Sequence, residues 1–388
     1  MKKDQQHTNV PLLRFPEFSG EWEKCKVSDL LDFYSTNSLS WEQLEYDTNA
    51  MMNLHYGLIH VGLPTMVDLA KDKLPNIKED NIPKNFELCK EGDVAFADAS
   101  EDTNEVAKTI EFYNLAEKNV VCGLHTIHGR DNKHKTVVGF KGYVFSSTAF
   151  HNQIRRIAQG TKIYSISTKN FSECYIGLPS KPEQTKIATL LRLIDERIAT
   201  QNKIIEKLQS LIKGLAAQLT QSGTPNIRLC DCLECHSSTL QENCVSVTGS
   251  YPVYGATGLI GYTNNYAYNG ESILIVKDGS GVGSLSYVND HFSVIGTLNY
   301  LTAKENYSIL YLYYALMAFN FTPYITGMAI PHIYFKDYGK AKLFYPSIEK
   351  RIRIASLLHN IEQKLVVEQN LVISLSAQKS YLLRMLFI

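Results

Sequence analysis

Residues 179–191, PSKPEQTKIATLL, recur as residues 346–358, PSIEKRIRIASLL, so that proline, serine, isoleucine, alanine and two leucines keep their places. Each copy has the features of a helix start. In the first copy, Ser180 and Glu183 have the spacing of a capping box, in which two side chains bond to backbone amides at the start of a helix. Gly223 is placed to end that helix. The duplication therefore predicts two long helices that begin in the same way.

The repeat extends beyond the predicted helices. At the same offset of 167 residues, Gly160 falls on Gly327 and Ile163 falls on Ile330. The domain starts match more weakly, VSDLLD with LCDCLE, at an offset near 202. Because the larger offset requires additional residues in the first copy, we expect an insertion around residues 35–90. Two copies of one unit, a globular domain followed by a helix, explain this pattern.

Both predicted helices carry apolar residues at alternating steps of four and three, which is the heptad spacing of a coiled coil. The shared polar step is Gln201 in the first helix and Glu368 in the second, and Lys379 interrupts the second pattern once more. We name the apolar positions the helix seam. They are Ile187, Leu191, Ile194, Ile198, Ile205 and Leu208 in the first helix, and Ile354, Leu358, Ile361, Leu365, Val372 and Leu375 in the second.

Two matched seams in one chain favour pairing of the helices with each other. About 39 residues at 1.5 Å each give helices about 58 Å long. If a pseudo-dyad relates the two copies, the helices run antiparallel, and Gln201 and Glu368 lie within a turn of each other near mid-length. Such a polar pair sets the register of a coiled coil at some cost in stability. The alternative is that each amphipathic helix packs on the core of its own domain.

Outside the helices, the sequence has the short apolar runs and polar turns that are typical of strands. GDVAFADAS from Gly92 and GESILIVKDGS from Gly270 each place one strand between two turns. The predicted fold class is α+β: two similar domains, rich in short strands and of mixed α/β character, joined by two long helices in an antiparallel intramolecular coiled coil. The predicted boundaries are 1–180 for the first domain, 181–222 for the first helix, 223–347 for the second domain and 348–388 for the second helix.

Composition limits the class of protein. Hydrophobic residues make up 44% of the chain and charged residues 20%, as in globular proteins. No apolar run reaches the roughly 18 residues that span a bilayer. The start, MKKDQQHTNVPLL, lacks the apolar segment of a secretory signal. These features predict a cytoplasmic protein that has no membrane partner.

The eight cysteines are expected to be reduced thiols in such a protein. Zinc sites usually show a two-residue gap in both ligand pairs, and in the one cysteine cluster only Cys232 and Cys235 have it. Three histidines, His125, His128 and His134, also lack strict ligand spacing. We therefore predict no metal site, and the less favoured alternative is zinc at the cluster of Cys230, Cys232, Cys235 and His236.

The sequence shows no catalytic motif. KDGSGVGSLSYV, from Lys277, has three glycines, but a phosphate-binding loop needs a helix after them, and here a strand is predicted. GxxxxGK[ST], HExxH and the Asn-Pro-Pro-aromatic signature of amino-methylating enzymes are missing from the chain. We therefore predict no catalytic residues.

Three stretches carry a family resemblance: LRFPEFSGEWEKCKVSDLL near the start, YPVYGATGLIGY at the opening of the second domain, and the repeated helix start. With them, the chain resembles the specificity subunit of a type I restriction-modification enzyme over essentially its whole length. The resemblance implies two target-recognition domains, each reading one half of a bipartite site in double-stranded DNA, held apart by antiparallel helices that measure the unread spacer.

The resemblance also implies partners that perform the chemistry. Two modification subunits, which bind S-adenosylmethionine and methylate adenine at N6, are expected to dock along the helices and domains. Two restriction subunits, which use ATP and magnesium, join the complex in some members of the family, and the sequence leaves open whether they do so here. The chain itself is expected to be a non-catalytic subunit without a cofactor.

Loop position and repeat alignment select candidate DNA contacts. In addition to these candidates, the basic residues Arg130, Lys133 and Lys135 form a cluster that suits an anionic ligand. The acidic stretch ADASEDTNE departs from the basic loop that is common in the family, which argues against phosphate contact there. The candidates are Asp98, Ser100, Arg155, Arg156, Lys162 and Tyr164 in the first domain, and Lys277, Asp278, Ser280, His332 and Lys336 in the second.

Two other classes of function compete with this interpretation. The chain could be a single-chain or fused restriction enzyme, which requires catalytic motifs that the sequence does not show. It could also be a coiled-coil adaptor whose end domains bind peptide or glycan, which predicts no salt-dependent DNA binding.

Overall fold

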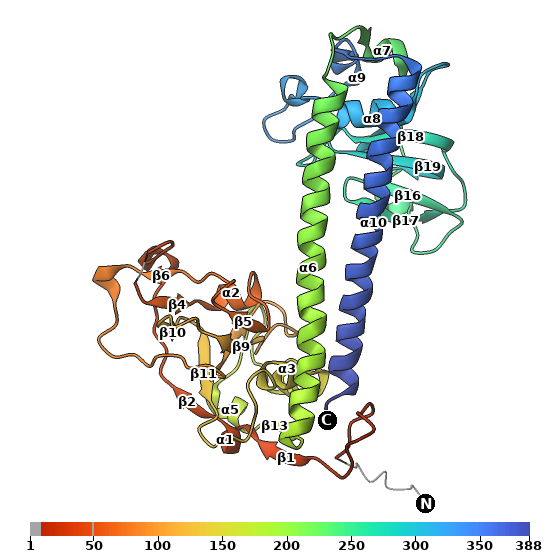
Figure 1. The fold of residues 1–388 in the computed structure, drawn as a ribbon. Coiled ribbons are helices and arrows are strands. Elements are labelled where there is room, and N and C mark those ends of the chain that lie inside the picture. The colour runs from red at the N-terminus through yellow and green to blue at the C-terminus, as the bar shows by residue number, and fades with distance from the viewer. Residues whose placement is uncertain (1–8, 49) are drawn as a thin grey trace, which may run out of the picture. The chain divides into compact units, whose positions relative to one another are not determined.

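A computed structural model describes residues 9–48 and 50–388 (Figure 1). The stretch inspected for a secretory signal begins in residues 1–8, which lie outside the described residues. The chain forms two compact units, which we call unit 1 (Met1–Thr200 with Leu371–Ile388) and unit 2 (Gln201–Asn370). Each long helix contributes residues to both units. The domain boundaries given above follow chain segments and stay a prediction.

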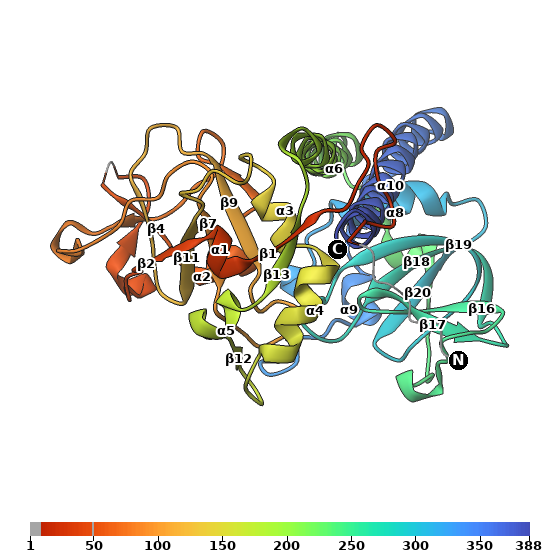
Figure 2. The ribbon, with the colours of Figure 1, turned by 90° about the horizontal axis from the view of Figure 1, so that it is seen from below.

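The centre of unit 1 is a five-stranded sheet in the order β2-β11-β7-β9-β5, of which Figure 2 labels the first four strands. Its central strand β7 pairs antiparallel with both β11 and β9, whereas β5 lies parallel to β9. All four residues of β7 are buried. The strands are β2 (Asp32–Tyr34), β5 (Met66–Asp68), β7 (Val94–Ala97), β9 (Thr109–Asn114) and β11 (Thr126–Arg130).

A second sheet in unit 1 has four strands in the order β10-β4-β6-β3. Three of them come from residues 44–77, within the segment where the repeat offsets predict an insertion. The fourth, β10, pairs in parallel with β4, and a short connection leads from it to β11 of the first sheet. The strands are β3 (Leu44–Glu45), β4 (Met52–Leu54), β6 (Asn76–Ile77) and β10 (Val120–Cys122).

Unit 1 also contains two small antiparallel ladders, five short α-helices and two 3₁₀ helices, η1 (Trp41–Gln43) and η2 (Glu79–Asn81). In the ladders, β1 (Glu23–Lys26) pairs with β13 (Tyr175–Leu178), and β8 (Ala99–Ser100) pairs with β12 (Tyr164–Ser165). The helices are α1 (Val27–Leu30), α2 (Tyr56–His60), α3 (Lys141–Phe145), α4 (Thr148–Ile157) and α5 (Thr168–Ser172).

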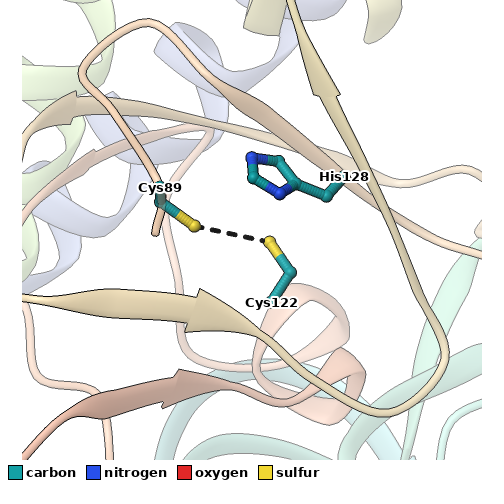
Figure 3. Close-up of side chains that lie close together, drawn as sticks. All are labelled: Cys89, Cys122 and His128. Atoms are coloured by element: carbon teal, nitrogen blue, oxygen red, sulfur yellow. Dashed lines mark hydrogen bonds between the residues drawn. The ribbon is translucent and has the colours of Figure 1, made fainter. Parts of the chain in front are cut away.

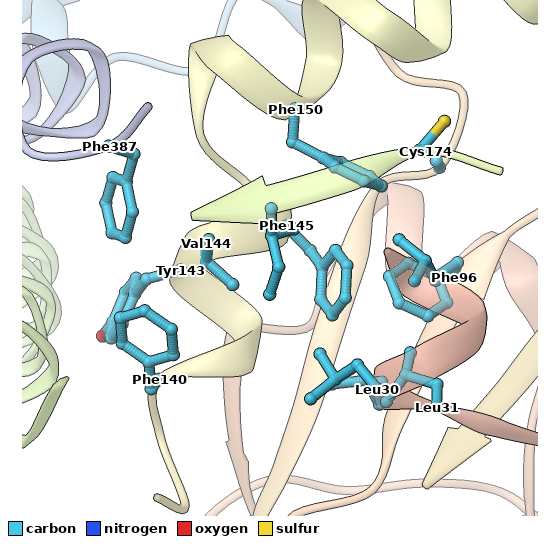
Figure 4. Close-up of a cluster of buried hydrophobic side chains, with 14 of the residues drawn as sticks. Leu30, Leu31, Phe96, Phe140, Tyr143, Val144, Phe145, Phe150, Cys174 and Phe387 are labelled. Atoms are coloured by element: carbon cyan, nitrogen blue, oxygen red, sulfur yellow. The ribbon is translucent and has the colours of Figure 1, made fainter. Parts of the chain in front are cut away.

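Aromatic side chains fill the core of unit 1 (Figure 4). The Phe96 ring on β7 lies 5.0 Å from the ring of Phe145 and 4.5 Å from that of Phe171, measured between centroids. The C-terminal end of the chain joins this core, since the Phe387 ring lies 6.1 Å from that of Phe140. The last turns of the second long helix are therefore anchored in the domain that begins the chain.

Unit 2 is built on a six-stranded sheet in the order β15-β20-β18-β19-β16-β17. Helix α8 packs against β18 and β19 (Figure 2), and its Tyr311 and Tyr314 are fully buried. The sheet strands are β15 (Leu233–Ser237), β16 (Tyr251–Gly255), β17 (Gly258–Thr263), β18 (Tyr268–Val276), β19 (Leu285–Val294) and β20 (Leu298–Ala303). The remaining elements are the ladder of β14 (Ile227–Arg228) with β21 (Lys342–Leu343), the helices α7 (Leu229–Cys232), α8 (Ile309–Met317) and α9 (Phe335–Tyr338), and two 3₁₀ helices, η3 (Glu242–Cys244) and η4 (Thr322–Tyr324).

The two long helices are α6 (Lys181–Thr220), with 40 residues, and α10 (Ile348–Met385), with 38 residues. In unit 2, Gln201 of α6 donates a hydrogen bond to Glu368 of α10, and Lys350 near the start of α10 donates to Ser222 just beyond α6. The later residue on the α6 side, Ser222, contacts the earlier residue of α10, Lys350, so the two helices run antiparallel. All twelve seam residues are buried or half-buried, which confirms the predicted antiparallel coiled coil.

The ends of the long helices also pack on globular cores. In unit 1, Leu191 of α6 and Leu382 of α10 belong to one buried cluster with the domain's own side chains. In unit 2, Ala216 of α6 and Leu358 of α10 do the same. The alternative, packing on the core of the helix's own domain, therefore holds only for the start of each helix, since the end of α6 packs in unit 2 and the end of α10 in unit 1.

Lys379, the charged interruption of the seam, has a polar partner in unit 1. Its Nζ lies 2.6 Å from Oδ1 of Asp195, and the hydroxyl of Tyr143 donates to Oδ2 of the same carboxylate over 2.9 Å. A charged contact that includes the neighbouring domain thus takes the place of an apolar seam contact.

The predicted capping box is replaced by a different contact. The Glu183 carboxylate accepts hydrogen bonds of 2.7 and 2.8 Å from Arg14 and one of 3.3 Å from the Trp22 indole. The stretch LRFPEFSGEW therefore attaches the N-terminal segment to the first turn of α6. The helix ends at Thr220, three residues before Gly223.

Candidate nucleic-acid interface

A tight turn with the same backbone pattern occurs in each unit. In unit 1, Gln159 and Ser165 exchange two backbone hydrogen bonds of 2.9 and 2.8 Å. In unit 2, Thr326 and His332 exchange two of the same lengths. Both pairs are related by the sequence offset of 167 residues. We call residues 159–165 turn 1 and residues 326–332 turn 2.

Both turns depend on a glycine at their second residue. Gly160 has φ of 140° and Gly327 has φ of 90°, a region that other residues seldom occupy. A Cβ atom at either position would collide with the carbonyl oxygen of the residue three places later, Ile163 or Ile330. The glycine match in the sequence repeat thus marks a backbone requirement that is shared by both units.

A second loop lies beside each turn. Loop 1 (98–106) follows β7, and loop 2 (277–282) follows β18. The residue that closes each loop, Ala107 or Gly283, has a positive φ of 59° or 86° and donates its backbone amide to the last residue of the strand. The loops differ in length and sequence, but they leave and rejoin their sheets in the same way.

Backbone hydrogen bonds join each turn to its loop. In unit 1, Ser100 is paired with Tyr164 in the β8–β12 ladder, and the Ile166 amide donates to the carbonyl of Asp98 over 2.9 Å. In unit 2, Asp278 forms a bridge with His332, and the Ile333 amide donates to the carbonyl of Lys277 over 3.0 Å. Ile166 and Ile333 are again 167 residues apart, so one turn-and-loop arrangement is present twice.

The sequence identifies the family to which this architecture belongs. The family model described as the type I restriction modification DNA specificity domain matches residues 122–210 and 227–375, which together exceed half of the chain. The chain belongs to this family. Each matched range contains one turn, and the second also contains loop 2.

Two curated proteins are similar to parts of this specificity chain. The EcoprrI type I specificity subunit of Escherichia coli is 28% identical over 112 residues, which cover 29% of this chain and 28% of that protein. A Mycoplasma pneumoniae protein named as a type I specificity subunit is 30% identical over 138 residues, which cover 34% and 43%. The matches therefore span less than half the length of these relatives.

Two solved structures share the fold over nearly the whole chain. The crystal structure of a type I restriction-modification S subunit from M. genitalium aligns with a TM-score of 0.64 at 18% identity, covering 98% of this chain and 99% of that one. A chain from a structure concerned with complex assembly and conformational transition of the type I system aligns with a TM-score of 0.54 at 15% identity, covering 95% and 97%. At these identities the likeness concerns the fold alone.

In unit 1 of this specificity chain, the predicted contact residues gather around turn 1 and loop 1. Asp98 and Ser100 lie in the loop, while Lys162 and Tyr164 lie in the turn. The chain enters the turn from the last turn of α4, where Arg155 and Arg156 are exposed.

In unit 2, the predicted residues gather around turn 2 and loop 2. Lys277, Asp278 and Ser280 lie in the loop, and His332 closes the turn. Lys336 lies four residues further on, in α9, with its Nζ 5.1 Å from the centroid of the Tyr334 ring. The contact roles of all these residues stay a prediction.

Sequence reasoning missed the apolar tips of the turns. Ile163 in turn 1 is 62% exposed, and its counterpart Ile330 in turn 2 is 65% exposed. Met328 at the tip of turn 2 is also fully exposed, and the Tyr334 side chain is about half exposed. The signal that could have found the isoleucines was their alignment in the repeat, because an apolar residue that recurs at an exposed turn has no role in a core.

Three of the four carboxylates in loop 1 have neighbouring partners. The Asp98 carboxylate lies 3.1 Å from a ring nitrogen of His125, and Asp102 accepts the backbone amide of Asn104 over 2.9 Å. Glu105 lies 2.7 Å from Lys108. That this acidic loop does not contact phosphate stays a prediction.

Three further basic candidates have intramolecular roles. Arg130 is buried and forms ion pairs with Asp93 at 2.8 Å and Glu87 at 2.6 Å, so it is unavailable to a ligand. Lys133 donates to the carbonyl of Asp29, and Lys135 lies 3.3 Å from Glu23. The sequence could not reveal this, because their partners are distant along the chain.

The cysteine cluster at residues 230–236 consists of separately bonded side chains. Cys232 is buried and donates to backbone carbonyls, while His236 stacks on Tyr300 and bonds to Thr302. Burial raises the pKa of Cys235 to about 11, although nearby Lys277 acts in the opposite direction. Across residues 9–48 and 50–388, one group of three metal-ligating side chains does come together, and it lies elsewhere, in unit 1. Within the same ranges, no helix is both long and apolar enough to cross a membrane.

Proposed function

We propose that this chain is the DNA-sequence-specificity subunit of a type I restriction-modification complex, in which each unit reads one half of a bipartite site. The observation that carries the proposal is the duplication of the turn-and-loop arrangement. Two sites of the same construction in one chain suit two half-sites on one duplex, as paired recognition elements do in other DNA-binding proteins.

In each unit, different parts of the arrangement would have different tasks. The exposed cations Lys162, Arg155 and Arg156 would contact phosphates and set position without reading sequence. The loop side chains and the tip isoleucines would face base edges, where an apolar group can contact the methyl group of thymine. The two loops share a backbone frame but differ in side chains, which would let the two half-sites differ in sequence.

The long helices would set the spacer and dock the partners. Two modification subunits would bring S-adenosylmethionine and methylate adenine at N6, and restriction subunits, where present, would bring ATP and magnesium. The chain would supply no catalytic group. The apolar side chains that α10 leaves exposed, Ile352, Val367 and Ile373 among them, are suitable contacts for such a partner.

The test requires the DNA site and a complex with the modification subunit. Sequencing of methylated adenines in host DNA, with and without the gene, would supply the site. Binding is then measured on four duplexes: the intact site, each half-site scrambled, and both scrambled. We expect Ile163→Ser to reduce discrimination at one half-site and Ile330→Ser at the other, because each removes an apolar contact with base edges.

Two controls separate sequence reading from general effects. Ile82→Ser changes an exposed isoleucine of unit 1 outside turn 1 and loop 1, and should leave both half-sites unaffected. Lys162→Ala should weaken binding to all sequences and lower the salt slope by about one. If both isoleucine variants lost discrimination at the same half-site, the assignment of one half-site to each unit would be contradicted. Equal affinity of the complex for intact and doubly scrambled duplexes would refute the function itself.

A further inference from the structure

A buried group of two thiols and one imidazole lies in unit 1, away from turn 1 and loop 1. Figure 3 shows Cys89, Cys122 and His128 with their side chains directed toward one another. The two sulfur atoms are 3.6 Å apart, and one ligand atom from each residue lies within 4.8 Å of the others. All three residues are at least 95% buried. Neither the proposed function nor the family description assigns them a role.

The imidazole of His128 is oriented as metal-binding histidines are. Its Nε2 lies 2.7 Å from the Asp93 carboxylate, while Nδ1 is buried without a hydrogen-bond partner. The nitrogen without a partner is on the ring edge that faces the sulfur atoms (Figure 3). Metal-ligating histidines usually donate the other ring N–H to a carboxylate, which fixes the tautomer. Asp93 has this position here, and Arg130 holds Asp93 with hydrogen bonds of 2.8 Å from both Nε and Nη2.

We propose that Cys89, Cys122 and His128 bind a zinc ion. Thiolate and imidazole are the ligands that zinc prefers. With zinc–sulfur bonds of about 2.3 Å, two tetrahedral ligands lie about 3.8 Å apart, close to the sulfur separation observed. Binding replaces two thiol protons, which pass to solvent, with one divalent cation. The resulting group of two thiolates, a neutral imidazole and Zn²⁺ carries no net charge, which suits its burial. A water molecule would occupy the fourth position.

The site would join the two sheets of unit 1. Cys122 ends β10 in the four-stranded sheet, His128 lies on β11 in the five-stranded sheet, and Cys89 precedes β7 and donates its backbone amide to the carbonyl of Val120. The ion would therefore fasten the inserted sheet to the central one. Spacing in the sequence could not find it, because 33 residues separate the cysteines.

The same ion would also stabilise the approach to loop 1. The connection from Cys122 to His128 is bonded to the site at both ends, and its middle residue, His125, is the one whose ring contacts Asp98. His125 has φ of 53°, a conformation that needs support from its surroundings. The metal proposal does not rest on the proposed function, since binding of the ion is measured without DNA.

The test uses the full chain, expressed with zinc and assayed for metal by mass spectrometry. We expect one zinc ion per chain. After chelation and refilling with cobalt, thiolate-to-cobalt charge-transfer bands and the visible bands of tetrahedral cobalt should appear. Cys89→Ser and Cys122→Ser should abolish the bands, whereas Cys25→Ser and Cys174→Ser, at other buried cysteines of unit 1, should leave them unchanged.

Because a serine variant can fail to fold, the wild-type measurements decide the matter. A well-folded wild-type chain without stoichiometric zinc and without cobalt–thiolate bands would overturn the proposal. So would retention of copper in place of zinc, or a Cys89–Cys122 disulfide in the purified chain. Bands that persist in both folded serine variants would place the metal at other cysteines and overturn it equally.

Discussion

The buried polar pair between the long helices allows a quantitative test of the coiled coil. Gln201 is 2% exposed and donates to the Glu368 carboxylate, which is 6% exposed and also receives Lys364 from the next turn of α10. The perturbation is replacement by leucine, first singly as Gln201→Leu and Glu368→Leu and then together. Leucine suits a seam position in size and is a good helix former, so the backbone should tolerate it.

The magnitudes follow from the contacts that each variant leaves. Gln201→Leu removes a buried hydrogen bond to a charged group and should reduce the free energy of unfolding by about 2 kcal/mol. Glu368→Leu leaves the buried Gln201 amide without its acceptor and should cost about 1–3 kcal/mol. The double variant restores an apolar seam and should be neutral or up to about 2 kcal/mol more stable than wild type. The cycle therefore predicts a coupling above about 2 kcal/mol.

The assay is urea unfolding of the full chain with two probes. Far-UV circular dichroism follows both long helices, whereas tryptophan fluorescence follows unit 1 alone, since Trp22 and Trp41 are the two tryptophans. The pair lies in unit 2, so its effect should be larger in the dichroism transition if the units unfold separately. Gln209→Leu and Gln369→Leu, at exposed positions of α6 and α10, are matched controls that should change stability by less than about 0.5 kcal/mol.

The outcome that refutes the reasoning is additivity. If the double variant loses the sum of the two single losses, the side chains do not interact, and the helices have another register or do not pair. A stable double variant with relaxed spacer choice would instead identify the polar pair as the element that fixes register, at the expense of stability.

Three further predictions concern the helices, the N-terminal segment and the thiols. Deleting one heptad from both α6 and α10 shortens each helix by about 10 Å. The recognised spacer should become shorter by about one to three base pairs, while both half-sites are still read. Sequencing of methylated adenines measures the spacer, and an unchanged spacer would contradict the prediction. Glu183→Gln removes the buried negative charge that Arg14 pairs with and should cost about 3 kcal/mol in the fluorescence transition. A variant with wild-type stability in that transition would contradict it. Burial raises the pKa of the Cys232 thiol from 9.0 to about 12, so the thiol loses its proton at lower pH in the unfolded chain than in the folded one. The free energy of unfolding should therefore fall as the pH rises between those two values. Cys232→Ala should flatten this part of the pH profile of stability, and a variant profile identical to that of wild type would contradict the prediction.

What could be predicted from the sequence was what short-range spacing determines. A heptad pattern identifies the buried side of a helix whatever it packs against, because the period of the α-helix is local. The seam residues, the shared step of Gln201 and Glu368 and the glycines at 160 and 327 were all visible in this way. The repeat then indicated that the features shared by the two copies, the turn glycines and the helix starts, occur in both units.

Contacts between distant segments were decided only by the tertiary structure. Arg130 has the sequence context of a surface cation, yet it is buried against Asp93, because β7 and β11 are neighbours in the sheet. Glu183 fits a capping box but bonds to Arg14, 169 residues earlier. Lys379 interrupts the apolar pattern but has Asp195 as its partner.

The candidate sites likewise depend in part on local sequence patterns and in part on contacts between distant segments. The sequence by itself determined that there are two units, that they are alike and which face of each long helix is buried. Only the tertiary structure placed turn beside loop, exposed the tip isoleucines and brought Cys89 and Cys122 to His128. The physical reason is that strand pairing joins residues far apart in the chain, and a change of one residue in its register moves every side chain to the opposite face of the sheet.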